Sequence, residues 1–220
     1  ITNDPGYENY NWSGHSEEFV GIFPREPVPA NYPLLFYLPL TSLDLAPRSS
    51  AALYVNVQSV TTVGLHQPLV LKIYPLTKAF THGQVTWMNA STGNPWTNPG
   101  GDYNTSVYAT LTLRADPNGD PCLPAATGPH SCDIEPLMEY WETHPNYGLI
   151  MVPQDISGGT RYIYAESAAD PNVRPYVELQ QGTRILKATL YPNQFVSITR
   201  QAGYENYVLW NSFNYDQQEI

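Results

Sequence analysis

The residues that could carry catalysis are scattered along the 220-residue chain rather than grouped. A covalent or acid–base mechanism needs a nucleophile, a base and a group that orients the base, all within hydrogen-bond reach. The chain has no G-x-S-x-G motif, no H-E-x-x-H motif and no glycine-rich phosphate loop. Its five histidines fall in turns and at strand ends, so we assign surface or capping roles to His15, His66, His82, His130 and His144. We therefore predict a protein with no catalytic residues and no cofactor, and keep a hydrolase or lyase as a minor alternative.

One acidic loop carries oxygen ligands at a calcium-type spacing. Asp116, Asn118 and Asp120 occupy positions one, three and five of such a loop. The pattern then fails, because Pro121 replaces the usual glycine and Thr127 stands where a bidentate Glu belongs. We favour a turn here and keep a Ca²⁺ site as the alternative.

Two cysteines and three glycosylation triplets indicate an extracellular protein. Cys122 and Cys132 lie ten residues apart in a Pro- and Gly-rich loop, and we predict a disulfide between them, with two free thiols as the alternative. The triplets begin at Asn11, Asn89 and Asn104. Because the chain begins with Ile and has no apolar run that could span a bilayer, we expect a processed, extracellular or cell-surface product.

The composition favours strands and turns over helices. The chain has 21 Pro, 15 Gly and 17 Tyr, and only 14% of its residues are charged. A net charge of −10 with only ten Lys and Arg argues against a nucleic-acid partner, because phosphate contacts need clustered cations. At this length the chain fits a single all-β domain.

The clearest helix signal lies at about residues 136–144. Pro136 suits the first helical turn, and Pro145 ends the helix after about two turns. An apolar stripe at spacings of three and four residues is formed by Leu137, Tyr140, Trp141 and His144. So short a helix is unstable alone, and we expect it to close one end of a β-sandwich.

Short strands account for most of the remaining chain. Residues 50–60, SAALYVNVQSV, show the clearest alternation of apolar and polar side chains. The other predicted strands are 18–23, 34–38, 68–76, 85–88, 103–114, 147–152, 161–164 and 175–179. Residues 89–101 read as an ordered surface loop. We place Trp87 and Trp141 in the core and Trp96 outside it.

Several of these segments follow one another in the order of a known family. They are residues 50–55, 70–74, 85–89, the helix with Trp141, 146–149, 165–167 and 175–177. This order, over about residues 17–180, resembles the DNRLRE family. The resemblance implies a jelly-roll module of a secreted or cell-surface protein, and some members of that family resemble carbohydrate-binding modules.

The two ends of the chain share a five-residue sequence. Gly203-Tyr204-Glu205-Asn206-Tyr207 repeats Gly6-Tyr7-Glu8-Asn9-Tyr10 letter for letter, and a Trp follows each copy. We predict that these aromatic segments are assembly strands that pair with another subunit, through Gly6, Tyr7, Tyr10, Trp12, Tyr204, Tyr207 and Trp210.

These segments complete the domain organisation. We assign an N-terminal aromatic strand to residues 1–16, a DNRLRE-like jelly roll to 17–180, and a C-terminal extension to 181–220. Within the extension, residues 184–191 and 195–199 are predicted to form a hairpin around Pro192-Asn193, and 204–213 a further strand.

The function that follows is structural. We expect a secreted, non-catalytic subunit that binds copies of itself head to tail in an extracellular filament, since a heterologous contact propagates. The alternative is a carbohydrate-binding or adhesive module in which Trp96 and loop tyrosines stack on a glycan.

Overall fold

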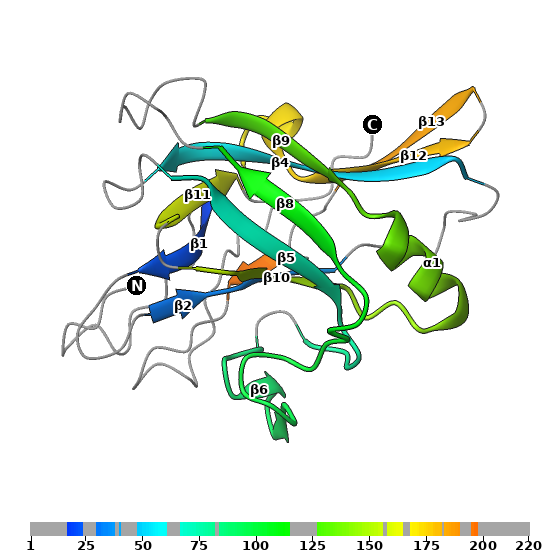
Figure 1. Cartoon of the computed structure of the whole chain (residues 1–220). Helices are drawn as coiled ribbons and strands as arrows, with labels where there is room; N and C mark the ends of the chain where they lie inside the picture. The colour runs from blue at the N-terminus through cyan, green and yellow to red at the C-terminus, as the bar shows by residue number, and fades with distance from the viewer. Residues whose placement is uncertain are drawn as a thin grey trace.

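The computed structural model describes residues 17–23, 30–37, 40, 48–60, 67–81, 84–114, 127–155, 158–164, 168–181, 183–189 and 195–197. These residues form a sandwich of two antiparallel sheets with one short helix at one end (Figure 1). The prediction of an all-β sandwich with a single short helix is therefore confirmed.

The first sheet has seven strands. These are β1 (Glu17–Phe23), β2 (Ala30–Tyr32), β4 (Ser50–Val60), β9 (Gly128–Asp133), β11 (Thr160–Tyr164), β12 (Tyr176–Gln181) and β13 (Arg184–Thr189). We call it the β4 sheet. The order is β13-β12-β4-β11-β1-β2, and β9 also pairs with β4.

The second sheet has five strands, in the order β14-β3-β10-β5-β8. Their bounds are β3 (Leu34–Phe36), β5 (Leu69–Pro75), β8 (Ala109–Leu113), β10 (Leu149–Pro153) and β14 (Phe195–Ser197). We call it the β5 sheet. A separate two-stranded ribbon joins β6 (Asn89–Ser91) to β7 (Asn94–Pro95), and a 3-10 turn occupies Pro171–Val173.

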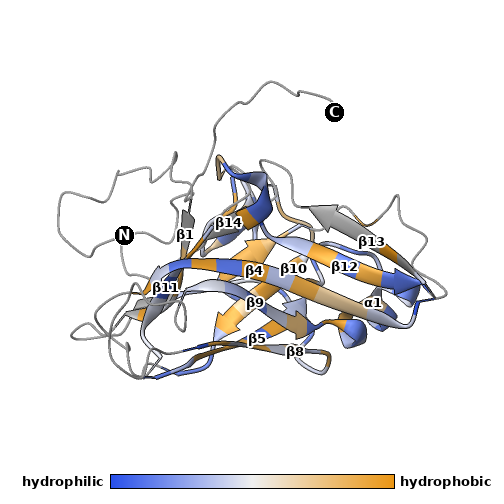
Figure 2. Cartoon of the chain, turned by 90° about the horizontal axis from the view of Figure 1, so that it is seen from above, coloured by the Kyte–Doolittle hydropathy of each residue, from blue (hydrophilic) through white to orange (hydrophobic). Residues whose placement is uncertain are grey.

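Strand β4 organises its sheet because it is eleven residues long. Residues 52–57 pair with β9, while residues 50–54 pair with β12 and 57–60 with β11. The residues of β4 that pair with β12 and with β11 overlap those that pair with β9. Strands β12 and β11 therefore both lie along the edge of β4 that faces away from β9. Ala51, Leu53, Val55 and Val57 point inward, and Figure 2 shows the same alternation of apolar and polar residues along β4. This confirms the pattern read from the sequence.

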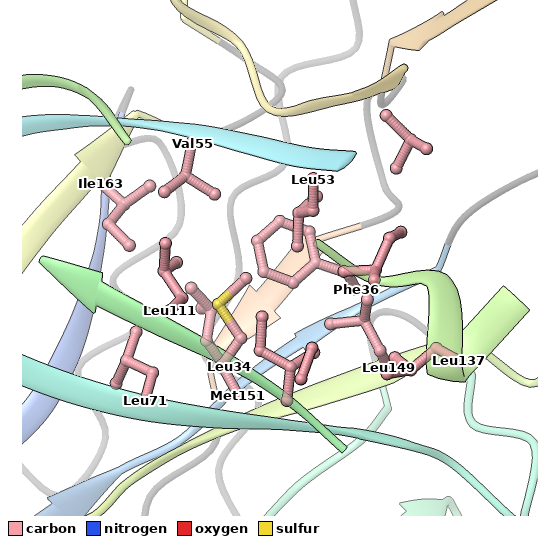
Figure 3. Packing of buried hydrophobic residues seen from close by; sticks show 14 of the residues in the cluster. Leu34, Phe36, Leu53, Val55, Leu71, Leu111, Leu137, Leu149, Met151 and Ile163 are labelled. Atoms are coloured by element: carbon pink, nitrogen blue, oxygen red, sulfur yellow. The ribbon is translucent and has the colours of Figure 1, made fainter. Parts of the chain in front are cut away.

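The main core lies between the two sheets. Leu53, Val55 and Ile163 from the β4 sheet face Leu34, Phe36, Leu71, Leu111, Leu149 and Met151 from the β5 sheet (Figure 3). All nine side chains are at most 1% exposed. Each such side chain contributes roughly 1.5–3 kcal/mol of hydrophobic free energy, so this cluster dominates the stability of the sandwich.

The helix α1 (Glu135–Thr143) packs Leu137, Met138 and Trp141 into that core. Asp133 Oδ1 accepts a hydrogen bond from the backbone N–H of Glu135 at 2.8 Å, which satisfies one N-terminal donor. The predicted stripe was right for Leu137 and Trp141 but wrong for His144. That residue is the exposed C-cap, and its ring stacks on Tyr140 with centroids 4.1 Å apart.

Three predictions about strands were wrong. Residues 184–197 do not form a hairpin, because β13 pairs with β12 in the β4 sheet while β14 pairs with β3 in the β5 sheet. The stretch 85–88 is not a strand, although Trp87 does pack against buried neighbours as a half-buried side chain. Strand β9 was expected to be loop, and it forms because β4 offers it a long edge.

Gly148, just before β10, shows why one position in this sandwich requires glycine. Its φ is +95°, and a Cβ there would lie 2.2 Å from the carbonyl oxygen of Phe36. The absence of a side chain lets β10 pair with β3 at Leu149, while Gly148 O accepts a hydrogen bond from Leu76 N at 2.9 Å.

Candidate functional site

A second, smaller core covers the outer face of the β5 sheet. Leu35, Tyr74 and Ile150 point away from the main core, and Val85 and Trp96 pack on them from the segment that joins β5 to β8. We call residues 76–108 the covering loop; it carries the β6–β7 ribbon that protrudes in Figure 1. This loop therefore belongs to the folded body.

Trp96 anchors the covering loop, and its predicted place outside the core was wrong. The side chain is only 5% exposed, and its Nε1 donates a 3.0 Å hydrogen bond to the carbonyl oxygen of Thr86. The backbone N–H of Trp96 also donates to Met88 O at 2.9 Å. A ring buried in this way offers no face to a glycan, so Trp96 is not a stacking residue.

Asp102 holds the tip of the same loop. Its carboxylate accepts hydrogen bonds from Thr97 N and Asn98 N, both at 3.0 Å, and Asp102 O accepts one from Thr77 N. Lys78 Nζ donates to Pro95 O at 2.5 Å. Around these groups lies a shallow, open, polar depression of about 420 Å³, lined by Thr77, Lys78, Thr97, Asn98, Asp102 and Tyr103. Its charged groups bind loop backbone, which indicates a mainly structural role.

Three tyrosines run beside this depression. Tyr103 stacks on Tyr74 with ring centroids 5.0 Å apart, and Tyr108 is 6.1 Å from Tyr74. Tyr108 is 45% exposed, and Lys72 Nζ lies 4.2 Å from its ring centroid. Burial raises the pKa of Tyr74 and that of Tyr103, so both phenols stay protonated at neutral pH. Tyr108 and the half-buried Tyr103 are the rings of this group that the covering loop presents to solvent, whereas Tyr74 belongs to β5 and is buried.

His130 joins the two sheets where β8 and β9 meet. Its Nε2 accepts a 3.1 Å hydrogen bond from the backbone N–H of Arg114, and its Nδ1 lies 3.0 Å from Gly128 O. The ring is therefore neutral, with the proton on Nδ1. Burial lowers the pKa of His130, the contact with Gly128 O raises it, and the charges of Arg114 and Arg161 lower it further, with a net decrease. Of the surface or capping role expected for His130, the surface position was wrong, since the side chain is 6% exposed, whereas its bond to Arg114 N–H satisfies a backbone donor at the end of β8.

We expect stability to fall as the pH drops below the ordinary histidine pKa of about 6.5. The unfolded chain takes up a proton there that the folded chain refuses, so the stabilisation is complete above that pH and is lost as the pH falls toward the lowered folded pKa of His130. His130→Gln keeps an acceptor for Arg114 N–H but does not titrate. Urea denaturation at several pH values between about 8 and 5 should show a smaller loss for the variant; equal losses would contradict this role.

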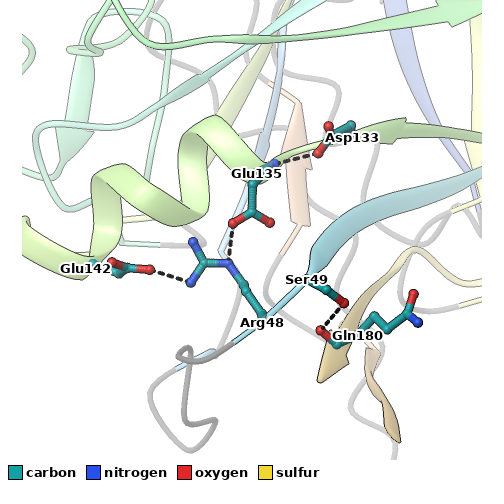
Figure 4. Close-up of polar contacts among 6 residues, drawn as sticks. All are labelled: Arg48, Ser49, Asp133, Glu135, Glu142 and Gln180. Carbon is teal, nitrogen blue, oxygen red and sulfur yellow. Dashed lines mark hydrogen bonds and ion pairs between the residues drawn. The ribbon is translucent and has the colours of Figure 1, made fainter. Parts of the chain in front are cut away.

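Two buried arginines hold chain segments together. Arg161 is fully buried, and its guanidinium donates to Gly158 O (2.6 Å), Thr160 O (3.1 Å) and Gln67 O (2.9 Å). Burial lowers the pKa of Arg161 to about 10, so it remains charged at neutral pH. Arg48 forms ion pairs with Glu135 (2.7 Å) and Glu142 (2.6 Å), which fastens α1 to the start of β4 (Figure 4).

The edges of the sheets differ in length and in covering. Beside β8 lies β9, joined to it by the bond between Arg114 and His130. The remaining outer strands are β2 and β14, with three residues each, and β13, with six. On β13, Ile185 is 66% exposed, the highest value for a large apolar side chain among the described residues. This exposed edge had no signal in the sequence, because it depends on which strand β13 pairs with.

Several predicted sites lie outside the described residues. They are the assembly segments with Gly6, Tyr7, Tyr10, Trp12, Tyr204, Tyr207 and Trp210, the triplet at Asn11, the calcium loop with Asp116, Asn118 and Asp120, and Cys122. In the part of the chain that the structure does describe, no group of three His, Cys, Asp or Glu side chains is placed to hold a metal ion. The calcium alternative stays a prediction.

Three further predicted site residues lie within the described part of the chain, and each has its own surroundings. Cys132, in β9, is a free thiol in the structure, and burial raises its pKa to about 12, so the disulfide with Cys122 stays a prediction. Asn89 lies in β6, where its backbone N–H donates to Thr86 Oγ1 at 3.0 Å. Asn104 lies in an exposed turn and accepts a 2.9 Å bond from Ser106 N.

The α-helix in the described part of the chain, α1, falls well short of the length that a bilayer span requires. No protein-family model matches this chain, and no curated protein matches it either. The resemblance to the DNRLRE family stays a prediction.

Proposed function

We propose that the chain is a secreted, non-catalytic structural subunit that joins copies of itself head to tail into an extracellular filament. The observation that carries this proposal is the outer edge of β13. Among the described strands, β13 pairs only with β12, and it exposes a large apolar side chain, Ile185, to solvent. Natural sheets usually protect such an edge, so an open one favours pairing with another chain.

The sequence of the two ends supports the same function. The repeated Gly-Tyr-Glu-Asn-Tyr segments supply backbone and aromatic side chains that suit an added strand. If a terminal segment of one copy pairs with a sheet edge of another, donor and acceptor are different surfaces. A contact of that kind is heterologous, and it continues from subunit to subunit unless it closes into a ring.

The test is the assembly state of the intact protein. We expect negative-stain images of the purified chain to show filaments or rings, and sedimentation velocity to show large species that dissociate on dilution. Deleting the terminal segment that donates the strand, residues 1–11 or residues 202–220, should shift the distribution toward monomers. An intact chain that stays monomeric at high concentration would overturn the proposal.

A glycan-binding function is the alternative outcome. Trp96 is buried and cannot stack on a sugar, but Tyr108 and the polar depression beside Tyr103 remain accessible to one. Retardation of the monomer in a polysaccharide gel, without assembly, would favour that function.

A further inference from the structure

We propose that β13 of one subunit is the acceptor for residues 204–210 of a second copy, which add to the β4 sheet as a new edge strand. This inference rests on the proposed self-assembly and names its two surfaces. It follows from the backbone of β13, from the competing edges, from charge, and from the sequence of the donor.

The backbone of β13 is arranged to accept a strand. All six of its residues pair in unbroken antiparallel register with β12, from Arg184 opposite Gln181 to Thr189 opposite Tyr176. In an antiparallel pair every second residue directs its N–H and C=O away from the partner. No strand among the described residues occupies that side of β13, so these groups are positioned to bind an incoming strand.

The other edges are poorer acceptors. Strands β2 and β14 have three residues each, about half the length of β13. At about 3.3 Å per residue, β13 offers roughly 20 Å of edge, enough for a six- or seven-residue donor. In Figure 1, β12 and β13 lie at the upper right, well away from the β6–β7 ribbon of the covering loop at the bottom of the view.

Charge favours an acidic donor at this edge. The chain as a whole carries a net charge of −10, yet β13 has two basic residues, Arg184 and Lys187, and no acidic one. Residues 201–220 contain Glu205, Asp216 and Glu219 and no Lys or Arg. A basic strand on an acidic protein attracts this segment and suppresses pairing of β13 with another β13, because like charges would then meet.

The C-terminal copy of the repeat suits a strand better than the N-terminal copy. After the shared Tyr, residues 208–210 are Val, Leu and Trp, whereas residues 11–13 are Asn, Trp and Ser. Val and Trp favour strands and Asn disfavours them. Residues 204–210 are therefore the donor, and Glu205 is the acidic residue nearest the start of that strand.

Two full-length variants separate the acceptor from the donor. Ile185→Lys places a charge on the exposed edge of β13 and leaves the donor intact, while Val208→Pro removes a backbone donor from residues 204–210 and leaves β13 intact. Met88→Lys is the matched control, because Met88 is an exposed apolar side chain (37%) on the covering loop, away from β13. Circular dichroism and melting curves establish that each variant is folded.

We expect the wild type and Met88→Lys to assemble equally, and each of the other two variants to sediment as a monomer. Mixed in equal amounts, Ile185→Lys and Val208→Pro should form a heterodimer and stop there, because only one functional donor and one functional acceptor remain. If Ile185→Lys fails to fold, the charge reversal Lys187→Glu replaces it, and Glu205→Lys on the donor should restore binding to it.

The possible failures are distinct. A monomeric wild type overturns the filament and this inference together. If the wild type and Ile185→Lys both assemble, β13 is not the acceptor, and the filament proposal stands. If Val208→Pro assembles normally, the donor is wrongly assigned. If the wild type assembles but the two monomeric variants do not complement each other, β13 and residues 204–210 are not each other's partners, and this inference is overturned.

Discussion

Trp96→Ala is expected to lower the free energy of unfolding by about 3–5 kcal/mol, the range for removing a buried aromatic side chain. The ring packs in the second core with Tyr74, Ile150 and Val85. Its loss leaves a cavity under the covering loop and an unpaired Thr86 carbonyl, where Nε1 now donates at 3.0 Å. Urea denaturation measures the total effect, and hydrogen exchange should show faster exchange concentrated in residues 84–104.

Trp96→Phe is the matched control. It keeps most of the packing but removes the bond to Thr86, so we expect a loss of roughly 1–2 kcal/mol. The same preparations also test the sugar-stacking role once expected for Trp96. A folded, fully stable Trp96→Ala that had lost retention on a glycan would contradict the buried position of this ring.

Arg48→Met is expected to cost roughly 3 kcal/mol. The Arg48 side chain is 2% exposed, and its loss leaves the Glu135 carboxylate without this cation. The Oε2 atom of Glu135 is buried and accepts no hydrogen bond from the described residues. Removing one partner of a buried ion pair typically costs about 3–5 kcal/mol. We place Arg48 at the lower end because Glu135 is 28% and Glu142 is 43% exposed at the side chain. Chemical denaturation at neutral pH gives the value.

The two glutamates provide the comparison. Glu142→Gln should change stability by less than about 1 kcal/mol, since an exposed ion pair contributes little. Arg48→Met combined with Glu135→Gln should recover part of the loss, because the uncompensated charge is then gone. Burial lowers the pKa of Arg48, but the hydrogen bonds and charges of Glu142 and Glu135 outweigh it, with a net increase. If Glu135→Gln alone and Glu142→Gln alone changed the free energy of unfolding equally, this account would be contradicted.

The parts of the fold that the sequence predicted are those with strong local patterns. The alternation in residues 50–60 corresponds to β4, and the stripe around Leu137 and Trp141 corresponds to α1, within one residue at each end. In both cases the periodicity of apolar residues is set by the element itself, so no knowledge of its partners is needed.

The parts that the sequence did not predict depend on partners distant in the chain. Strand β9, GPHSCD, has few strand-forming residues and exists because β4 provides an edge. Strands β13 and β14 were expected to pair with each other. Instead, β13 pairs with β12 in the β4 sheet and β14 pairs with β3 in the β5 sheet. Trp96 lies in a stretch of Pro, Gly and Asn that is typical of a surface loop. It is buried because the outer face of the β5 sheet is apolar and Trp96 packs on that face.

The candidate assembly site also has one part that the sequence predicted and one part that it did not. The repeat at the two aromatic ends predicts strand donors, and these segments lie outside the residues that the structure describes. The sequence could not identify an acceptor, because an open edge is a property of the finished sheet and not of any one segment. Ile185 shows this, since its exposure follows from the position of β13 at the outside of the sheet.

The division of β13 and β14 between the two sheets would also affect how the proposed filament resists pulling. Under tension, load would enter a subunit at β13 and leave through the segment beyond β14. Between β13 and the C-terminal segment the chain passes through β14, which pairs with β3 over three residues. The three-residue pairing of β14 with β3 is then the first contact to be strained. In the proposed filament, we therefore expect the breaking force to depend on this short strand pair more than on the packing of the main core.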